Sequence, residues 1–122
     1  MKVKSLKFLK DKAWKLISLF VRTNGGTVEY NNCFTCGARL HYKELQCGHY
    51  IHNKLDYELD NLKPQCVRCN KWLSGNLGIY AEKLIRLIGA KRVEKMRLHA
   101  FKKGNDYNRA ELMEIISKYA QI

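Results

Sequence analysis

The sequence predicts an α+β fold, in which a small zinc-stapled core of short strands carries flanking helices on its N-terminal and C-terminal sides. Three observations lead to this prediction. Two Cys-x-x-Cys pairs, Cys33/Cys36 and Cys66/Cys69, lie 29 residues apart in the middle of the chain. Between them, the residues around His49 alternate in the pattern of a strand. Outside them, apolar residues recur with the spacing of helices.

The length of the chain, 122 residues, fits one domain. We therefore expect a single domain over residues 1–122. It comprises a basic amphipathic helix at 1–22, a zinc-knuckle core at 27–76 and a helical C-terminal extension at 77–122. Hydrophobic residues make up 46% of the sequence, which is normal for a folded globular protein.

The positive charge of the chain points to an anionic partner. Lys and Arg total 23 against 11 Asp and Glu, so the formal net charge is +12. DNA is the simplest partner for such a surplus, and the alternative is a basic protein whose charge serves solubility alone. No apolar run is long enough to cross a membrane, and none is typical of a signal peptide. We expect a cytoplasmic protein with no membrane partner.

Residues 1–22 have the spacing of an amphipathic helix. Its apolar positions recur mostly at intervals of three or four residues: Leu6, Leu9, Ala13, Leu16, Ile17 and Phe20. Lysines occupy much of the remaining surface, which is either a solvated face or a contact to DNA. Paired glycines, Gly25-Gly26, permit the sharp turn that ends this helix.

A strand is expected over residues 44–52, followed by a polar loop that leads to the second cysteine pair. Alternate residues share one side of this strand, namely Leu45, Cys47, His49 and Ile51. Gly48 inside the strand indicates a bulge or the close approach of a ligand. His52 follows His49 by three residues, so on a regular strand its side chain points away from that of His49.

The C-terminal part of the sequence predicts several helices. One begins near Cys69 and breaks at Gly75-Asn76, where Asn76 can cap the next helix. After Gly89 a further helix covers 90–103, and Gly104-Asn105 ends it. Asn108 and Glu111 then have the spacing of a capping box for a last helix over 109–120.

Four cysteines at this spacing indicate a structural zinc ion. Zinc prefers four tetrahedral ligands, and four thiolates leave no open position for a substrate. The binding free energy of such a site is about 10–16 kcal/mol, as large as the stability of a whole domain. We therefore expect removal of zinc to unfold the core. The fifth cysteine, Cys47, is expected to be a small buried residue.

The segment between the cysteine pairs offers the residues to hydrolyse a phosphodiester. This reaction needs a base that activates water and a cation that neutralises charge on the phosphate and the leaving oxygen. His49 could be the base, and Asn70, at the start of the following helix, could hold a divalent ion. A lone strand histidine is more often structural, but its position between two zinc knuckles favours the catalytic alternative.

The ordered set of motifs resembles the ββα-metal nucleases, also called HNH or His-Me finger nucleases, in the group with zinc knuckles that includes phage endonuclease VII. It is still more similar to the NinG or Rap family of lambdoid phage recombination proteins. The matching segments lie within residues 12–95, and they are Cys33-Phe34-Thr35-Cys36-Gly37, Gly48-His49-Tyr50, Gln65-Cys66-Val67-Arg68-Cys69-Asn70 and Leu73-Ser74-Gly75-Asn76.

This resemblance implies a role for each matched residue. The two Cys-x-x-Cys pairs would hold the structural zinc, and His49 would be the general base. Asn61 would tie the loop to the hairpin by hydrogen bonds and orient the histidine. Asn70 would ligate a catalytic Mg²⁺ or Mn²⁺. The family acts on branched DNA, chiefly recombination intermediates such as Holliday junctions and D-loops, in the cytoplasm of the host bacterium.

One departure from the nuclease pattern bears on the catalytic metal. Enzymes similar to endonuclease VII carry an aspartate immediately before the histidine as a second metal ligand, whereas this chain has Gly48. Asn70 is then the one protein ligand that the resemblance supports. Waters and a DNA phosphate would complete the shell of Mg²⁺, which keeps several waters in proteins. Weak metal binding in the absence of DNA follows from this arrangement.

Three functions remain open on the sequence. The first is a structure-specific, metal-dependent endonuclease for branched DNA. The second is an HNH nickase of ordinary duplex DNA. The third is a non-catalytic zinc protein that binds DNA or assists recombination, in which His49 and Asn70 are ordinary polar residues. Symmetric cleavage of branched DNA needs two active sites, so the sequence also leads us to expect a homodimer.

Overall fold

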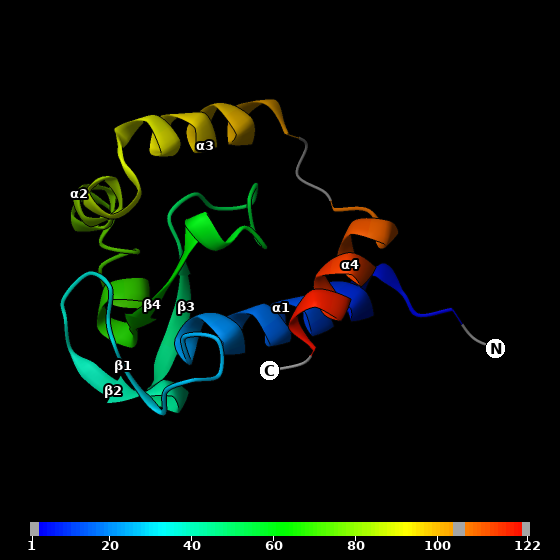
Figure 1. Cartoon of the computed structure of the whole chain (residues 1–122), viewed down its shortest axis with the longest axis horizontal. Coiled ribbons are helices and arrows are strands. Elements are labelled where there is room, and N and C mark those ends of the chain that lie inside the picture. The colour runs from blue at the N-terminus through cyan, green and yellow to red at the C-terminus, as the bar shows by residue number, and fades with distance from the viewer. Residues whose placement is uncertain (1–2, 104–106, 121–122) are drawn as a thin grey trace.

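The structure is a computed structural model that describes residues 3–103 and 107–120. Figure 1 shows two small sheets at the lower left, with one group of helices above them and another to their right. Helices α1 (Leu6–Arg22) and α4 (Arg109–Tyr119) pack against each other on one side. Helices α2 (Leu77–Ile88) and α3 (Ala90–Lys102) form the other group. The predicted α+β class, with helices on both sides of a small core, is confirmed.

Each sheet is an antiparallel pair of short strands. Strand β1 (Tyr30–Asn32) pairs with β2 (Arg39–His41), and β3 (Leu45–His49) pairs with β4 (Leu62–Cys66). In the second pair Leu45 lies opposite Cys66 and His49 lies opposite Leu62. His49 therefore stands at the loop end of this hairpin, and the second cysteine pair begins at the other end.

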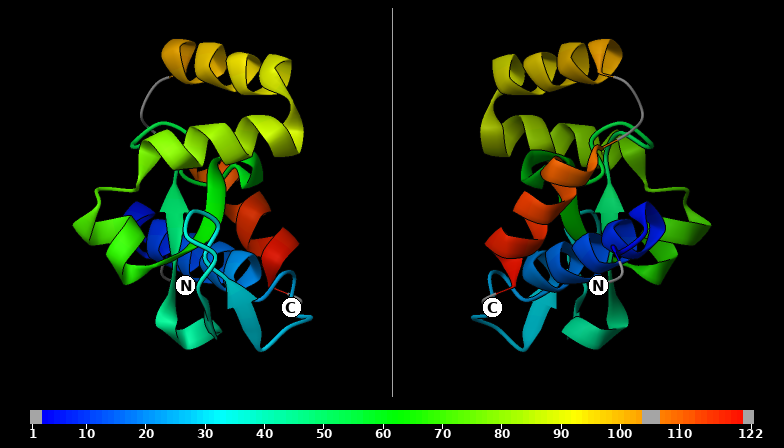
Figure 2. Two further views of the ribbon diagram at one scale, coloured as in Figure 1. Left: turned by 90° about the vertical axis from the view of Figure 1, so that its left-hand side faces the viewer. Right: turned by 90° about the vertical axis from the view of Figure 1, so that its right-hand side faces the viewer.

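Besides the cluster of Cys33, Cys66 and Cys69, the described apolar side chains form three clusters rather than one continuous core. The first joins α1 to the β3–β4 hairpin through Ile17, Cys47, Leu62 and Tyr119. The second joins α1 to α4 through Leu9, Ala13, Tyr107 and Leu112. The third lies under α2 and α3 and contains Leu55, Tyr80, Leu84, Val93, Met96 and Ala100. Figure 2 shows α2 and α3 stacked at one end of the molecule, above the sheets and α1.

Three local expectations from the sequence need correction. The strand predicted over 44–52 ends at His49, and Glu44 belongs to a short 3-10 turn, Tyr42–Glu44. Asn76 precedes α2 but does not cap it with its side chain, because it adopts a left-handed backbone with φ of 48°. Leu6, predicted on the buried face of the first helix, is exposed.

Other expectations about the helices are met. The buried residues of α1 include Leu9, Ala13 and Ile17 from the predicted apolar face. The Asn108–Glu111 capping box is present with both of its hydrogen bonds. Gly104-Asn105, predicted to end the helix before it, lies outside the described residues. No helix among residues 3–103 and 107–120 is long and apolar enough to cross a membrane.

Candidate functional site

The four predicted zinc ligands converge. The sulfur atoms of Cys33, Cys36, Cys66 and Cys69 all lie within 4.8 Å of one another. The Cys36 and Cys66 sulfurs are 3.7 Å apart, close to the edge of about 3.8 Å in a tetrahedron whose Zn–S bonds are about 2.3 Å. The donor set and its spacing therefore fit a zinc ion. Within the described part of the chain, no other group of three or more His, Cys, Asp or Glu side chains converges in this way.

Both cysteine pairs form the tight turn that directs backbone amides at sulfur. The amide of Cys36 donates to the sulfur of Cys33, and the amide of Cys69 donates to that of Cys66, each over 3.5 Å. Gly37 follows the first turn with a φ of 82°, a conformation that suits glycine. Amide donors of this kind stabilise thiolate charge, so the turns favour metal binding.

A row of buried hydrogen-bonded groups lies next to the four cysteines. The hydroxyl of Thr35 lies 3.4 Å from the sulfur of Cys33. The amide nitrogen of Gln65 donates to this hydroxyl over 3.1 Å and to the carbonyl oxygen of Gly75 over 2.9 Å. Gln65 is fully buried. These bonds fix the first cysteine turn to β4 and to the segment before α2, so the two halves of the site form one unit.

Gly48 is required because Gln65 occupies the space beside it. A Cβ atom placed on Gly48 would lie 1.8 Å from the side-chain oxygen of Gln65 and 2.7 Å from its amide carbon. Gln65 has little freedom to move, since its amide nitrogen makes the two bonds described above. The sequence predicted a bulge or the approach of a ligand at Gly48; the strand pairing is regular there, with Gly48 opposite Lys63, and the group that approaches is Gln65. An aspartate at this position would have to displace Gln65.

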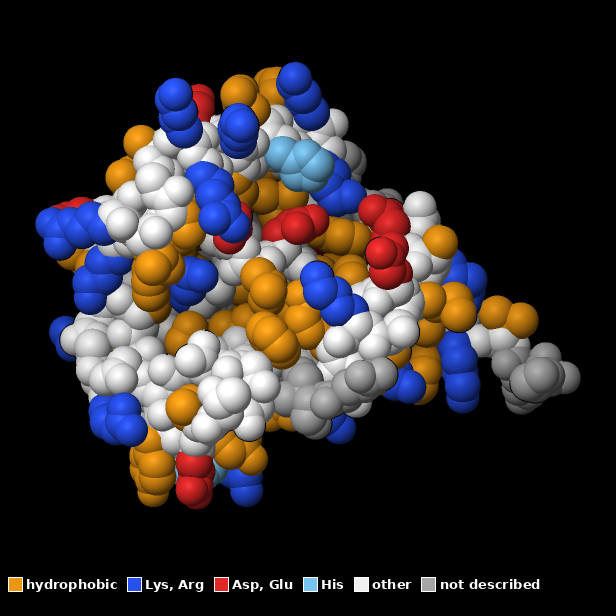
Figure 3. All heavy atoms as spheres, in the orientation of Figure 1, with side chains coloured by type: hydrophobic (Ala, Val, Ile, Leu, Met, Phe, Trp, Pro, Cys, Tyr) orange, Lys and Arg blue, Asp and Glu red, His pale blue; other side chains and the backbone are white. Residues whose placement is uncertain are grey.

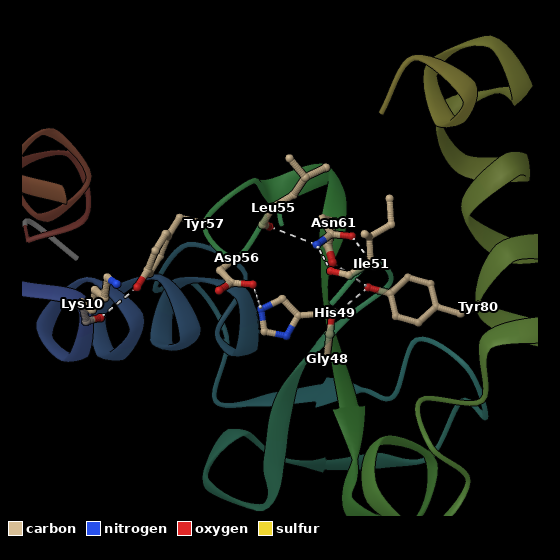
Figure 4. Close-up of polar contacts among 9 residues, drawn as sticks. All are labelled: Lys10, Gly48, His49, Ile51, Leu55, Asp56, Tyr57, Asn61 and Tyr80. Carbon is tan, nitrogen blue, oxygen red and sulfur yellow. Dashed lines mark hydrogen bonds and ion pairs between the residues drawn. The ribbon is translucent and has the colours of Figure 1, made fainter. Parts of the chain in front are cut away.

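His49 lies between helix α1 and the loop that follows β3 (Figure 4). Its ring stacks on that of Trp14, with 4.8 Å between centroids and 11° between planes. Its Nε2 is 3.6 Å from a carboxylate oxygen of Asp56, an ion-pair distance too long for a hydrogen bond. Tyr57, next to Asp56, donates to the carbonyl oxygen of Lys10 and so ties the loop to α1.

Burial lowers the pKa of His49 below the ordinary value of 6.5. The charge of Asp56 acts in the opposite direction, and nearby His52 adds to the lowering. The net direction leaves the imidazole neutral at pH 7, which is the form that can accept a proton. Nε2 is buried and has no hydrogen-bond partner among the described residues.

The side chain of Asn61 makes hydrogen bonds within the loop that joins β3 to β4, and its role in orienting His49 stays a prediction. Its side-chain oxygen accepts from the amide of Ile51 over 2.6 Å, and its side-chain nitrogen donates to the carbonyls of Ile51 and Leu55 over 2.8 and 3.0 Å. Asn61 is fully buried. Tyr80 of α2 donates to the carbonyl oxygen of Gly48 from the other side. The residues around His49 are therefore held from both sides (Figure 4).

Asn70 lies in a π-helical turn, Arg68–Trp72, and contacts the hairpin at a different place from His49. Its side-chain nitrogen donates to the side-chain oxygen of Gln46 over 2.8 Å. Gln46 is three strand positions from His49, roughly 10 Å along β3, and alternation directs it to the opposite face of the hairpin. None of the polar contacts among the described residues joins Asn70 to His49. A metal-ligating role for Asn70 stays a prediction.

The comparison with protein families decides the relationship of the chain. The family described as the bacteriophage Lambda NinG protein matches residues 1–122, the whole chain. The chain belongs to the NinG family. No curated protein and no solved structure matches it. The resemblance to NinG seen in the sequence is thereby confirmed at the level of the family.

Two residues of the His49 environment in this NinG-family chain were missed from the sequence. Asp56 faces the imidazole after six intervening positions of loop, a separation that no spacing rule fixes. Trp14 is 35 positions away on α1 and reaches His49 only through packing of the helix on β3. The one available signal was the position of Trp14 beside the predicted apolar face of this helix.

The structure corrects the expectation for His52 and meets that for Cys47. The rings of His52 and His49 lie 5.7 Å apart rather than pointing away from each other, because the strand ends at His49 and the chain bends. Cys47 is buried against Ile17 and Leu62. Burial raises the pKa of its thiol to about 12, so it remains a neutral core residue.

Charge on the NinG-family surface is not uniform. Acidic side chains lie between the Lys and Arg side chains on the face shown in Figure 3. A hollow of about 410 Å³ is lined by four of them, Glu58, Asp60, Glu111 and Glu114. Arg92 and Lys118 line the same hollow, and Arg92 pairs with Asp60, so acidic and basic side chains are mixed there.

Proposed function

We propose that this NinG-family chain is a structure-specific endonuclease that uses a divalent metal ion to cleave branched DNA recombination intermediates such as Holliday junctions and D-loops. The single observation that carries the proposal is His49, a half-buried imidazole with a lowered pKa. It is held by Trp14 and Asp56 at the end of a zinc-clamped hairpin. Membership of the NinG family supports the assignment to phage recombination.

In this proposal His49 takes a proton from the attacking water. Asp56 stands beside Nε2, so it favours the tautomer with the proton on that nitrogen. The lone pair is then on Nδ1, which becomes the proton acceptor. The stack on Trp14 and the bonds of Asn61 fix the ring and the loop, so little reorganisation is needed when DNA binds.

A divalent cation, when bound, would neutralise charge on the phosphate and on the leaving oxygen. Among the residues present, Asn70 fits this ion in part. Its side-chain nitrogen is committed to Gln46, which leaves the side-chain oxygen free of that bond and suited to Mg²⁺ or Mn²⁺. Gly48 contributes no ligand. The protein would therefore hold the ion weakly until a DNA phosphate joins the shell.

A second candidate function is a non-catalytic zinc protein that binds DNA or assists recombination. One observation favours it, because Asn70 contacts Gln46 on the face of the hairpin opposite to His49. In that case the His49 environment would be structural. Nicking of ordinary duplex DNA is a further outcome of the same experiment.

The test is cleavage of labelled four-way junction, D-loop and linear duplex by the zinc-loaded protein with Mg²⁺ or Mn²⁺. We expect cutting of branched DNA in preference to duplex. His49→Ala should reduce the cleavage rate by about 10²–10⁴-fold, the usual contribution of a general base, while binding is retained. His99→Ala is a matched control, since His99 lies on α3 away from the hairpin.

Each alternative has its own result in this experiment. Equal cutting of junction and duplex would replace the proposal by the duplex nickase. No cutting with either metal, together with tight DNA binding, would leave the accessory DNA-binding protein. Cutting that survives His49→Ala would remove the assigned base.

A further inference from the structure

The most exposed aromatic side chain of the zinc-bound region is Trp72. It lies in the π-helical turn Arg68–Trp72, and 81% of its surface is accessible. Large apolar side chains left in water are costly, and contiguous ones mark interaction sites. Leu73 beside it and Val67 at the start of the turn are also exposed. This turn therefore presents three exposed apolar side chains that are close together in the sequence.

The surroundings of Trp72 are basic. No Asp or Glu occurs between Asp60 and Glu82 in the sequence. Arg68 and Lys71 are exposed in the same turn as Trp72. Neither makes an ion pair with any residue that the structure describes, so both charges face solvent. A large exposed aromatic ring in the same turn as two exposed cations matches the chemistry of nucleic acid, in which bases stack on the ring and phosphates meet the charges.

The turn is rigid enough to act as a platform. Cys69, one of the four converging cysteines, lies within it, so a zinc ion bound there would fix its backbone. The amide of Leu73 donates to the carbonyl of Arg68 over 2.8 Å, and the amide of Gly75 donates to that of Cys69 over 2.9 Å. A ring carried on a fixed turn loses little conformational freedom when a base stacks on it.

We propose that Trp72 is a stacking platform for an unpaired or unstacked DNA base, with Arg68 and Lys71 holding the adjoining phosphates. Bases in the middle of an intact duplex are already stacked and cannot use the ring. Bases at a branch point or on a single strand can do so. The platform would thus favour DNA with interrupted stacking over plain duplex. The inference rests on the proposed function only in taking DNA as the ligand.

The experiment measures binding without cleavage, in the His49→Ala background with zinc loaded and Mg²⁺ present. The probes are a fork with single-stranded arms, carrying 2-aminopurine at the branch, and a linear duplex of matched length. We expect Trp72→Ala to weaken binding to the fork about 10-fold, from the loss of one base–aromatic stack, and to leave duplex binding nearly unchanged. Quenching of 2-aminopurine by the protein should disappear with it.

Two further variants control this result. Trp72→Phe keeps an aromatic face and should restore most of the fork affinity and the quenching. Phe101→Ala removes an equally exposed ring, 87% accessible on α3, and should change neither. Because Trp72 is exposed, zinc content and circular dichroism of Trp72→Ala should equal those of the parent protein.

Other outcomes overturn the inference. Unchanged fork affinity in Trp72→Ala would remove the platform, whatever the cleavage assay shows. Equal loss of fork and duplex binding, accompanied by dissociation of a dimer in sedimentation, would show that Trp72 contacts a second copy of the chain. Failure of wild-type cleavage would refute the nuclease proposal but leave the stacking result to stand on the binding data.

Discussion

At the scale of single residues, His49 has neighbours that move its pKa in opposite directions. Burial lowers that pKa, the Asp56 carboxylate raises it, and His52 lowers it further. A general base must be unprotonated, so protonation of His49 should abolish the proposed nuclease activity. We therefore expect kcat/KM for branched DNA to rise with pH through an apparent pKa below 6.5 and then to level off.

The acidic limb of this pH profile is the range over which kcat/KM rises. Two substitutions should move it in opposite directions. Asp56→Asn removes the charge that favours imidazolium, so the pKa falls and the limb moves to lower pH. His52→Ala removes a neighbouring positive charge, so the pKa rises and the limb moves to higher pH. The measurement is single-turnover cleavage between pH 5 and about 8. Movement of both variants in the same direction would contradict the assignment of the limb to His49.

Individual residues differ in how far the sequence could predict them. The four zinc ligands follow from their spacing, since two residues between cysteines fix both sulfurs on one turn. The bonds of Asn61 followed from the family resemblance. The contacts of Trp14 and Asp56 with His49 could not be predicted, because they depend on how a helix and a loop pack. The clash that a side chain at position 48 would make with Gln65 likewise depends on tertiary structure.

At the scale of elements, the candidate zinc site joins parts of the chain that are also connected by the buried hydrogen bonds of Gln65. It links the turn between β1 and β2 to the end of β4, and both strand pairs are only two strands wide. Isolated two-stranded hairpins are at best marginally stable in water. We predict that Cys69→Ser, or chelation of zinc, unfolds the strand region, because the binding free energy lost, about 10–16 kcal/mol, matches the stability of a domain.

This prediction is checked by zinc content together with urea unfolding followed by circular dichroism. Cys47→Ala is the matched control, since Cys47 is a buried thiol outside the zinc site. It should keep one zinc per chain and lose only about 1 kcal/mol from the smaller side chain. A folded, zinc-free Cys69→Ser protein with unchanged stability would show that packing of α1 on the hairpin suffices without metal.

Elements with strong local signals could be predicted well from the sequence. Periodicity located α1, and the Asn108–Glu111 box located the start of α4, because both signals act within one or two turns. The start of α2 is different. Asn76 adopts a left-handed backbone and donates from its side chain toward the sulfur of Cys69 over 3.7 Å. The side chain of Asn76 is thus directed to one of the four converging cysteines instead of capping α2.

At the scale of the whole molecule, part of the positive charge serves the fold. Arg92 on α3 makes a two-bond ion pair with Asp60, and Arg97 on the same helix donates to the hydroxyl of Tyr50. The nitrogen of Lys54 donates to the carbonyl oxygen of Lys103. These contacts attach α3 to the segment after β3. Part of the positive charge of α3 is therefore engaged in contacts within the protein. The net charge of +12, which belongs to the whole chain, does not measure how much charge α3 presents to DNA.

We expect helix α1, rather than α3, to contact the DNA phosphate backbone near the candidate active site. Lys7 and Lys10 precede Trp14 by seven and four positions, so they share its edge of the helix, and Trp14 stacks on His49. The ion pair of Lys7 with Asp11 is exposed and hence weak. DNA that reaches His49 should pass along this edge.

We predict that log K for branched DNA falls steeply as the logarithm of the salt concentration rises. Helices α1 and α3 should contribute unequally to the slope of this plot. Each phosphate neutralised contributes about −0.9 to the slope of log K against log salt. Lys7→Gln with Lys10→Gln should therefore make the slope less steep by about 1.8. Lys91→Gln with Lys95→Gln, which removes the same charge from α3, should change it less. Fluorescence anisotropy between about 50 and 200 mM salt measures both. A larger change from the α3 pair would place the DNA on the opposite side of the molecule from α1 and would separate it from His49.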